Sequence, residues 1–142
     1  MTKHENIFTK EERICNETEI TRLFEKGESF ISYPVRVIWI VNNEDTTKIV
    51  KVLISVSKKK LRHAVDRNRV KRLVREAYRL NKTVFCNAIA ETGNSLSVCF
   101  IWLPSDLIDF KKVDRKITEA LARISQKISN QSVIPENGSR KE

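Results

Sequence analysis

The chain has 142 residues and a net charge of +9, which fits one basic domain with a single hydrophobic core. Its three glycines are too scattered for a glycine-rich phosphate loop, and its two histidines and three cysteines follow neither a zinc-site spacing nor a disulfide pattern. The N-terminus lacks the apolar core of a secretion signal, and the longest apolar stretch, residues 96–103, is too short to span a bilayer. We therefore expect a cytoplasmic protein that has no membrane partner.

The first predicted element is a short helix over residues 16–26. Asn16 can cap this helix, with Glu19 at the third helical position, and Gly27 can end it. Its apolar side chains recur at helical spacing and form one face, which consists of Ile20, Leu23 and Phe24.

Two strands are predicted next. Residues 35–41 are almost entirely apolar, which is typical of a well-buried strand. We expect Trp39 in this run, like Trp102 further along, to pack in the core. The polar residues 42–47 indicate a turn, and residues 48–57 have the pattern of a second strand, so the two strands are predicted to form a hairpin.

The C-terminal part of the chain contains a further strand and a helix. Residues 96–103 form a β-rich apolar run that ends at Pro104, and the apolar residues of 109–129 recur at helical spacing. Residues 129–142 are polar and include proline and glycine. We therefore expect a domain over residues 1–128, followed by a disordered tail.

The positive charge is concentrated in one segment. Residues 58–82 carry eleven basic and two acidic side chains, whereas basic and acidic side chains are equally numerous in the rest of the chain. Folding does not require this concentration of like charge, and its self-repulsion is destabilising. The segment therefore predicts a polyanionic partner, and nucleic acid is favoured over an anionic lipid surface.

From about Asp66 this segment predicts a helix with two different faces. Apolar residues at helical spacing form a stripe toward the core, which consists of Val70, Leu73, Val74, Ala77 and Tyr78. At about 100° per residue, the opposite face carries a polar ridge of Asn68, Arg72, Arg75 and Arg79. Asp66 is expected to cap the helix, and Arg67 is expected to lie exposed beside it. Both the ridge and the helix N-terminus favour phosphate groups as ligands.

The sequence from Ser55 to Arg79 resembles the signature of the bacterial ribonuclease P protein subunit. In that family a strand that ends in Ser-Val-Ser-Lys-Lys leads to a helix with the pattern Ala-Val-x-Arg-Asn-Arg-x-Lys-Arg-x-x-Arg. These two motifs occupy residues 55–59 and 64–75 here. Family members commonly have a glycine between them, whereas this chain has a longer, glycine-free turn at residues 60–63. The resemblance extends over residues 6–128.

The resemblance implies an α+β fold. It is a single-domain sandwich in which helices pack on a mixed central sheet of about four strands, with the element order α-β-β-β-α-β-α. It also implies a left-handed β-α-β crossover, like that of a domain 2 of ribosomal proteins. General chirality rules favour the opposite hand, so this expectation comes from the resemblance alone.

The resemblance further implies a role in tRNA maturation. In the family the catalyst is a large RNA, and the protein is the accessory subunit of a ribonucleoprotein that removes the 5′ leader from precursor tRNA. The chain is thus expected to bind the catalytic RNA and the leader without a catalytic site of its own. Magnesium is expected to bind through the RNA partner, and the protein outside the complex is expected to be monomeric.

The same resemblance assigns residues to each contact. The residues expected to bind RNA, with Arg79 added from the arginine ridge, are Lys58, Lys59, Arg67, Asn68, Arg69, Lys71, Arg72, Arg75 and Arg79. Those expected to line the leader cleft are Ile20, Phe24, Ile38 and Ser55. Ile20 stands where the family usually has an aromatic residue.

Other function classes remain open from the residues alone. The basic ridge equally supports a structural RNA-binding or ribosome-associated protein, which would bind RNA without stimulating cleavage of the leader. A self-sufficient protein nuclease would need a carboxylate cluster, and the sequence indicates none. DNA binding is least supported, because the basic helix has no dimerisation element and no groove-reading pattern.

Overall fold

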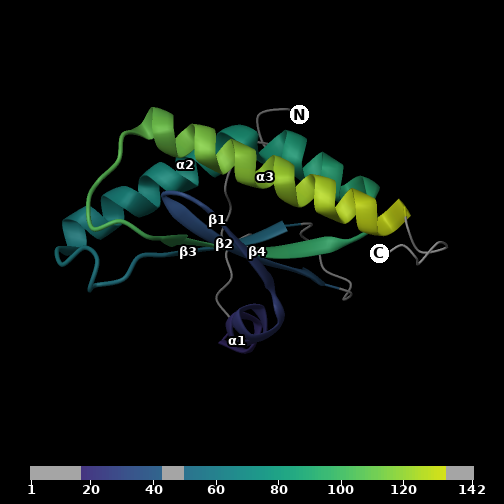
Figure 1. Ribbon diagram of the computed structural model, residues 1–142, viewed down its shortest axis with the longest axis horizontal. Coiled ribbons are helices and arrows are strands. Elements are labelled where there is room, and N and C mark those ends of the chain that lie inside the picture. The colour runs from purple at the N-terminus through teal and green to yellow at the C-terminus, as the bar shows by residue number, and fades with distance from the viewer. Residues whose placement is uncertain (1–16, 43–49, 134–142) are drawn as a thin grey trace.

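The computed structural model describes residues 17–42 and 50–133. In chain order its elements are α1 (Glu17–Lys26), β1 (Glu28–Ser32), β2 (Val35–Asn42), β3 (Val50–Ser55), α2 (Ala64–Glu91), β4 (Ser95–Trp102) and α3 (Phe110–Val133) (Figure 1). The predicted element order and the α+β class are therefore confirmed. The expected cap Asn16, residues 43–47 of the predicted turn and residues 134–142 of the predicted tail lie outside the described residues.

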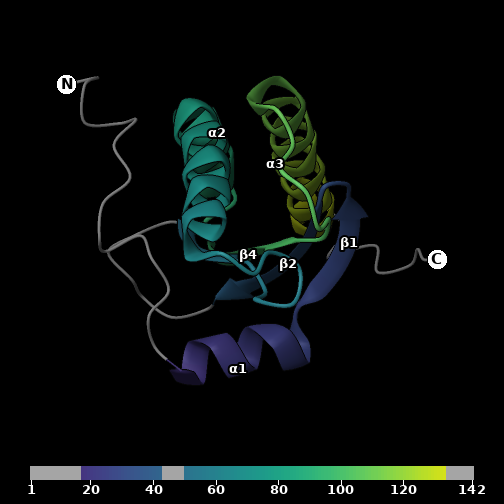
Figure 2. The ribbon, with the colours of Figure 1, turned by 90° about the vertical axis from the view of Figure 1, so that its left-hand side faces the viewer.

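The four strands form one mixed sheet in the order β1-β2-β4-β3. β2 pairs antiparallel with both β1 and β4, whereas β3 pairs parallel with β4. The parallel pair is joined through α2, which forms the expected β-α-β unit, and the left-handed sense of this crossover stays a prediction. α2 and α3 lie side by side on one face of the sheet, and α1 lies on the other face (Figure 2).

The predicted hairpin between residues 35–41 and 48–57 is wrong. β4 lies between β2 and β3, and β2 pairs instead with β1, to which the Tyr33-Pro34 connection joins it with a cis peptide bond. The sequence reading missed β1 because Phe30 is the one buried residue of this short edge strand, so the strand carries almost no periodic signal. The partner β4 follows a long helix, and no local pattern reveals it.

Most of the hydrophobic core lies between the sheet and the α2–α3 pair. The side chains of Trp39 and Trp102 are almost fully buried there, as predicted. A smaller cluster on the opposite face consists of Leu23, Ile38 and Cys99. β4 is buried on both faces, which explains why its sequence is nearly continuously apolar.

The predicted core stripe of α2 is confirmed. Its members Val70, Val74, Ala77 and Tyr78 are buried, and Leu73 is half-buried. The expected cap at Asp66 is wrong, because the helix begins earlier, at Ala64. His63 occupies the N-cap position without a side-chain hydrogen bond, and Asp66 lies in the first turn. A carboxylate in the first turn still interacts favourably with the helix dipole.

α3 continues to Val133, beyond the predicted domain boundary at residue 128. Residues 129–133, predicted to belong to the polar tail, are helical. The first helix-breaking residue after Ile128 is Pro135, so the sequence has no earlier signal that ends the helix. None of the helices in the described ranges is both long enough and apolar enough to cross a bilayer.

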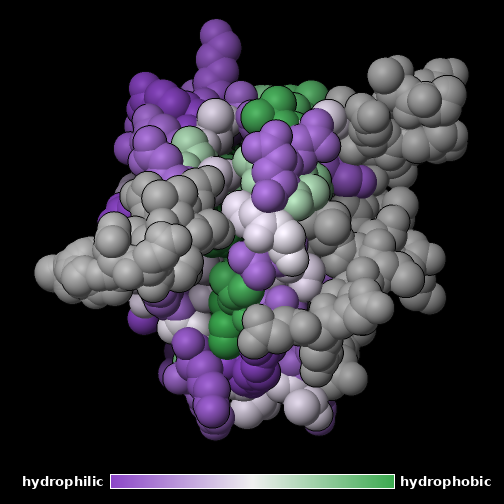
Figure 3. All heavy atoms as spheres, turned by 90° about the vertical axis from the view of Figure 1, so that its right-hand side faces the viewer, coloured by the Kyte–Doolittle hydropathy of each residue, from purple (hydrophilic) through white to green (hydrophobic). Residues whose placement is uncertain are grey.

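Large apolar side chains reach the surface at several separate places. On the face shown in Figure 3, hydrophobic residues form small patches surrounded by hydrophilic ones. The exposed large hydrophobic residues of the described ranges are Phe24, Ile31, Tyr33, Val65, Leu80, Val84 and Leu107. Isolated apolar residues are normal on a protein surface, but Phe24 and Ile31 both lie on the α1 side of the sheet.

Candidate nucleic-acid interface

α1 lies on the sheet face opposite α2 and α3 (Figure 2). Leu23 is its buried residue, and it packs in a cluster with Ile38 and Cys99. The turn after the helix approaches β2 so closely that a Cβ on Gly27 would lie 2.9 Å from Ile38 Cγ2 and 3.0 Å from the Trp39 carbonyl oxygen. The C-terminal end of α1 is therefore held directly against the sheet.

The side chains of α1 fall on two sides of Leu23. At about 100° per residue, Glu19 and Arg22 lie on one side, and Ile20 and Phe24 lie on the other. One flank of the helix is therefore charged, and the other is apolar.

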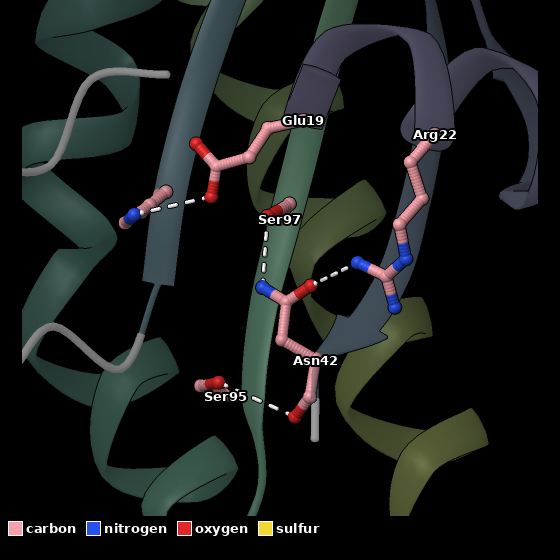
Figure 4. Close-up of polar contacts among 6 residues, drawn as sticks. Glu19, Arg22, Asn42, Ser95 and Ser97 are labelled. Carbon is pink, nitrogen blue, oxygen red and sulfur yellow. Dashed lines mark hydrogen bonds and ion pairs between the residues drawn. The ribbon is translucent and has the colours of Figure 1, made fainter. Parts of the chain in front are cut away.

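The charged flank of α1 makes polar contacts to three strands (Figure 4). Arg22 donates from Nη1 to Asn42 Oδ1 at 2.7 Å, and the Asn42 amide donates to Ser97 Oγ at 2.9 Å. Glu19 forms an ion pair with Lys51, with 3.2 Å between Oε2 and Nζ. These contacts join the helix to the end of β2, to β4 and to β3.

The apolar flank of α1 faces the other end of the sheet surface. The strand register places one residue of each strand in a row there: Ile31, Arg36, Ile101 and Ser55. Ile31 is 63% exposed and Phe24 is 49% exposed, while Ile20, Ile101 and Ser55 are half-buried. We call the set Ile20, Phe24, Ile31, Ile101 and Ser55 the α1 surface.

The α1 surface contains three of the residues predicted to line the leader cleft, namely Ile20, Phe24 and Ser55. Ile38 is only 5% exposed and packs with Leu23, so it supports this surface from below. Sequence reasoning missed Ile31 because it missed β1. It also missed Ile101, because only the strand register shows which face this residue occupies.

β3 leads directly into a basic turn. The backbone N–H groups of Lys60 and Leu61 both donate to the Ser57 carbonyl oxygen, and the Lys59 N–H donates to Ser57 Oγ. Leu61 is buried in the main core, which anchors the turn, while Lys58, Lys59 and Lys60 are exposed. The turn needs no glycine, because none of its residues has a positive φ.

Arg67 makes a structural contact that the sequence does not predict. Its Nη1 atom donates to the carbonyl oxygens of Leu61, at 3.0 Å, and Arg62, at 2.8 Å, and the side chain is half-buried. The expectation that Arg67 lies exposed is therefore wrong. This guanidinium joins the basic turn to the first turn of α2.

The structure divides the other predicted RNA-binding residues of α2 into two groups. Asn68, Arg69 and Arg72 are exposed. Lys71, Arg75 and Arg79 are half-buried, and the Nε atom of Arg75 is fully buried. Arg79 donates to both carboxylate oxygens of Glu76, at 2.7 and 3.0 Å. These hydrogen bonds lower the pKa of Glu76 and raise the pKa of Arg79.

The exposed basic turn and the start of α2 form one continuous segment of the chain. We call its exposed polar members the basic surface: Lys58, Lys59, Lys60, Arg62, Asn68, Arg69 and Arg72. Because Ser55 belongs to the α1 surface and Lys58 follows in the next turn, the two surfaces are connected by the end of β3.

In residues 17–42 and 50–133 no group of three or more His, Cys, Asp or Glu side chains is placed to hold a metal ion. Cys99 lies in the small core cluster, where burial raises the pKa of its thiol to about 12. This thiol stays protonated at neutral pH and is a poor nucleophile.

The chain is similar to known proteins in both sequence and fold. Residues 8–125 match the family model described as Ribonuclease P. The ribonuclease P protein component of Porphyromonas gingivalis is 38% identical over 125 residues, which cover 88% of this chain and 91% of that protein. The RNase P protein structure from Staphylococcus aureus superposes with a TM-score of 0.64 at 25% identity, covering 81% of this chain and 95% of that chain. The RNase P protein from Thermotoga maritima superposes with a TM-score of 0.63 at 26% identity, covering 79% and 96%.

Proposed function

The chain belongs to the ribonuclease P protein family, as the protein component of an endoribonuclease complex that processes tRNA, and we propose that it serves this complex by binding two RNAs side by side. The catalytic RNA binds the basic surface, and the 5′ leader of precursor tRNA binds the α1 surface. The observation that carries this proposal is the direct connection of the two surfaces through the end of β3 and the basic turn.

Exposure and charge support the basic surface as the contact for the catalytic RNA. Arg69 and Arg72 can each donate paired hydrogen bonds to a phosphate, and Lys58 and Lys59 add positive charge beside them. The N-cap residue His63 makes no side-chain hydrogen bond to the first turn of α2, and a helix N-terminus favours anions. The half-buried predicted contacts contribute mainly through their charge: Arg67, Lys71, Arg75 and Arg79.

The apolar side chains of the α1 surface, with the exposed Arg36 beside them, support this surface as the leader site. Aromatic and aliphatic side chains bind unpaired bases with little sequence preference. Phe24 is half exposed, and Ile31 lies in the same row as the exposed Arg36, which can meet the leader backbone. Ile20 provides an aliphatic contact where the family usually has an aromatic one, so we expect stacking of the leader to rest mainly on Phe24.

Catalysis belongs to the RNA in this proposal. The described residues hold no carboxylate cluster for a magnesium ion, and we infer that magnesium binds through RNA phosphates and activates water there. The protein contributes cations that reduce the repulsion between the two RNAs.

The cellular setting in this proposal is the cytoplasm. The scattered cysteines of the sequence fit a reducing compartment. Outside the complex the protein is monomeric, because its net charge of +9 opposes self-association.

The test is cleavage of precursor tRNA by the ribonuclease P RNA of the same organism at low magnesium, with and without the protein. We expect the protein to restore correct 5′ cleavage and to be inactive alone. Arg72→Ala should weaken this stimulation, whereas Arg123→Ala should not, because Arg123 is exposed on α3 and lies over Phe30 of β1, at the opposite edge of the sheet from β3.

Two other outcomes would change the assignment. Tight binding to the RNA without stimulation would favour a structural RNA-binding protein, the alternative that the basic residues alone leave open. Cleavage by the protein without RNA would overturn the proposal.

A further inference from the structure

Few apolar contacts hold α1 on the sheet. The helix has 10 residues, of which Leu23 is the buried one, and a helix of this length is not stable by itself in water. Leu23 and the close approach at Gly27 determine how near the helix lies to the sheet. Ile20 is half-buried and packs against the same cluster. With so few apolar contacts, the rotation of α1 about its own axis also depends on the polar contacts of its charged flank.

The contacts on the charged flank supply this constraint, with Asn42 at their centre. Its side chain accepts a hydrogen bond from Arg22 and donates one to Ser97, and its backbone oxygen accepts one from Ser95 Oγ at 3.4 Å. Ser97 is 2% exposed, so this end of the network is shielded from water. The hydrogen bond from the charged Arg22 donor lies at the exposed end of the network. Figure 4 shows Asn42 between Arg22 and Ser97.

The same guanidinium makes a second contact to β2, from Nη2 to the Val41 carbonyl oxygen at 3.3 Å. Glu19, one helical turn before Arg22, is paired with Lys51 on β3. Both charged residues therefore hold the same flank of α1 and pull it toward the ends of β2 and β3. The opposite flank, which carries Ile20 and Phe24, is turned toward the row that contains Ile31 and Ile101.

We propose that Asn42 is a positioning residue for the 5′ leader. By holding Arg22 against β2 and β4, it fixes the rotation of α1 and so the direction in which Ile20 and Phe24 face. This inference rests on the proposed leader site. It adds to that site a residue on the opposite flank of the helix, which acts through α1 and does not touch the leader.

Three variants test the role of the Asn42 side chain. Asn42→Ala removes both of its side-chain hydrogen bonds. Asn42→Asp keeps both, because one carboxylate oxygen accepts from Arg22 and the other accepts from the Ser97 hydroxyl, which can donate instead of accept. Asn87→Ala is the matched control, because Asn87 is exposed on α2.

The measurement is the affinity of the reconstituted protein–RNA complex for two precursor tRNAs, one with a long leader and one with a single-nucleotide leader. The ratio of the two affinities is the leader gain. We expect Asn42→Ala to reduce the leader gain by about fivefold, the effect of losing hydrogen bonds to a charged group. Affinity for the short-leader substrate and the single-turnover cleavage rate should stay unchanged, and Asn42→Asp and Asn87→Ala should keep the full gain.

An unchanged leader gain in Asn42→Ala, or an equal loss of affinity for both substrates, would overturn the inference. Absence of any leader gain with the unaltered protein would be a different result, because it would refute the proposed leader site itself. Should Asn42→Ala fail to fold, Ser97→Ala removes one bond of the network, and we expect about a twofold loss of leader gain from it.

A double-mutant cycle separates positioning from direct contact. Because Asn42 acts through the flank that carries Phe24, Asn42→Ala should cost little further leader gain once Phe24→Ala is present. Full additivity of the two substitutions would show that Asn42 does not act through this flank of α1, and would overturn the proposal.

Discussion

The guanidinium of Arg67 lies against the turn that precedes its own helix, with Nη1 3.0 Å from the carbonyl oxygen of Leu61. Leu61 is itself buried in the core, so Arg67 links a fixed point of the turn to the first turn of α2. The basic turn between the end of β3 and Leu61 presents Lys58 and Lys59. A member of the Arg-Asn-Arg motif thus supports the basic surface structurally, whether or not it touches RNA.

We expect Arg67→Ala to destabilise the isolated protein by about 1–3 kcal/mol, because two carbonyl oxygens lose a charged donor. Urea unfolding of the protein without RNA measures this loss. The matched control is Arg69→Ala, whose side chain is exposed and whose removal should change the stability by about 0.5 kcal/mol or less. Equal unfolding midpoints for the two variants would show that Arg67 has no structural role.

Local periodicity in the sequence predicts the elements whose residues have a strong pattern. The stripe from Val70 to Tyr78 is buried as its spacing requires, and the apolar runs around Trp39 and Trp102 are core strands. β1 could not be predicted in this way, because Phe30 is its one buried residue. Strand pairing across α2 depends on contacts far apart in the sequence, and this is why the hairpin prediction was wrong.

For the candidate site, too, local patterns predict which residues lie on an element but not which distant residues they contact. The motif predicts which basic residues lie on α2, but not which of them are engaged within the protein. Arg79 is held by Glu76 and Arg67 by the turn, because helix register and loop path bring these groups together. The contact between Arg22 and Asn42 joins a helix to a strand end, and it leaves no signal in either segment.

The buried thiol of Cys99 predicts a specific alkaline sensitivity. Its pKa is raised from 9.0 to about 12 by burial, so the unfolded chain releases this proton at a lower pH than the folded chain. The stabilising contribution is therefore complete below pH 9 and is lost as the pH rises toward 12. Between pH 8 and 10.5 the protein should lose about 2 kcal/mol more folding free energy than Cys99→Ala does.

Urea unfolding at the two pH values, with a reducing agent present, measures this difference. Other groups titrate in both proteins and cancel in the comparison, and the cavity left by the alanine affects both pH values alike. Parallel losses in the two proteins would contradict the raised pKa of Cys99.

Gly27→Ala should destabilise the protein through steric overlap. A Cβ at this position would lie 2.5 Å from the Leu23 carbonyl oxygen and 2.9 Å from Ile38 Cγ2, so α1 must move away from β2. We expect a loss of about 1–3 kcal/mol, as for other overpacked sites, measured by thermal unfolding. Gly93→Asn is the control, because a Cβ there meets nothing within 4 Å and asparagine tolerates its φ of 78°. Equal losses in the two variants would show that the contact with β2 is loose.

Arg72→Ala should weaken binding to the catalytic RNA and flatten its dependence on salt. Arg72 is exposed on the basic surface, and each lost phosphate contact lowers the slope of log affinity against log salt by about 0.7–0.9. Filter binding over a series of salt concentrations gives this slope. Arg123→Ala should leave it unchanged, and an unchanged slope in Arg72→Ala would show that the basic surface does not face the RNA.

Glu76→Gln should have the opposite effect and strengthen RNA binding. Glu76 holds Arg79 through two hydrogen bonds, and the glutamine removes one negative charge beside the basic surface while loosening this hold. We expect the RNA affinity to rise about threefold at moderate salt and the salt slope to steepen by up to about 0.7–0.9, the effect of one more phosphate contact. Both side chains of the pair are partly exposed, so the isolated protein should lose little stability.

The direction of the pKa shift adds a second check to this prediction. Arg79 lowers the pKa of Glu76, so this carboxylate stays ionised throughout the range from pH 5 to 8, and the gain from Glu76→Gln should be constant over that range. Glu119→Gln is the control for net charge, because Glu119 also forms an ion pair with a basic residue three positions away, with 3.6 Å to Lys116 on α3. If both substitutions raise the RNA affinity equally, the gain comes from net charge alone, and Arg79 does not reach the RNA.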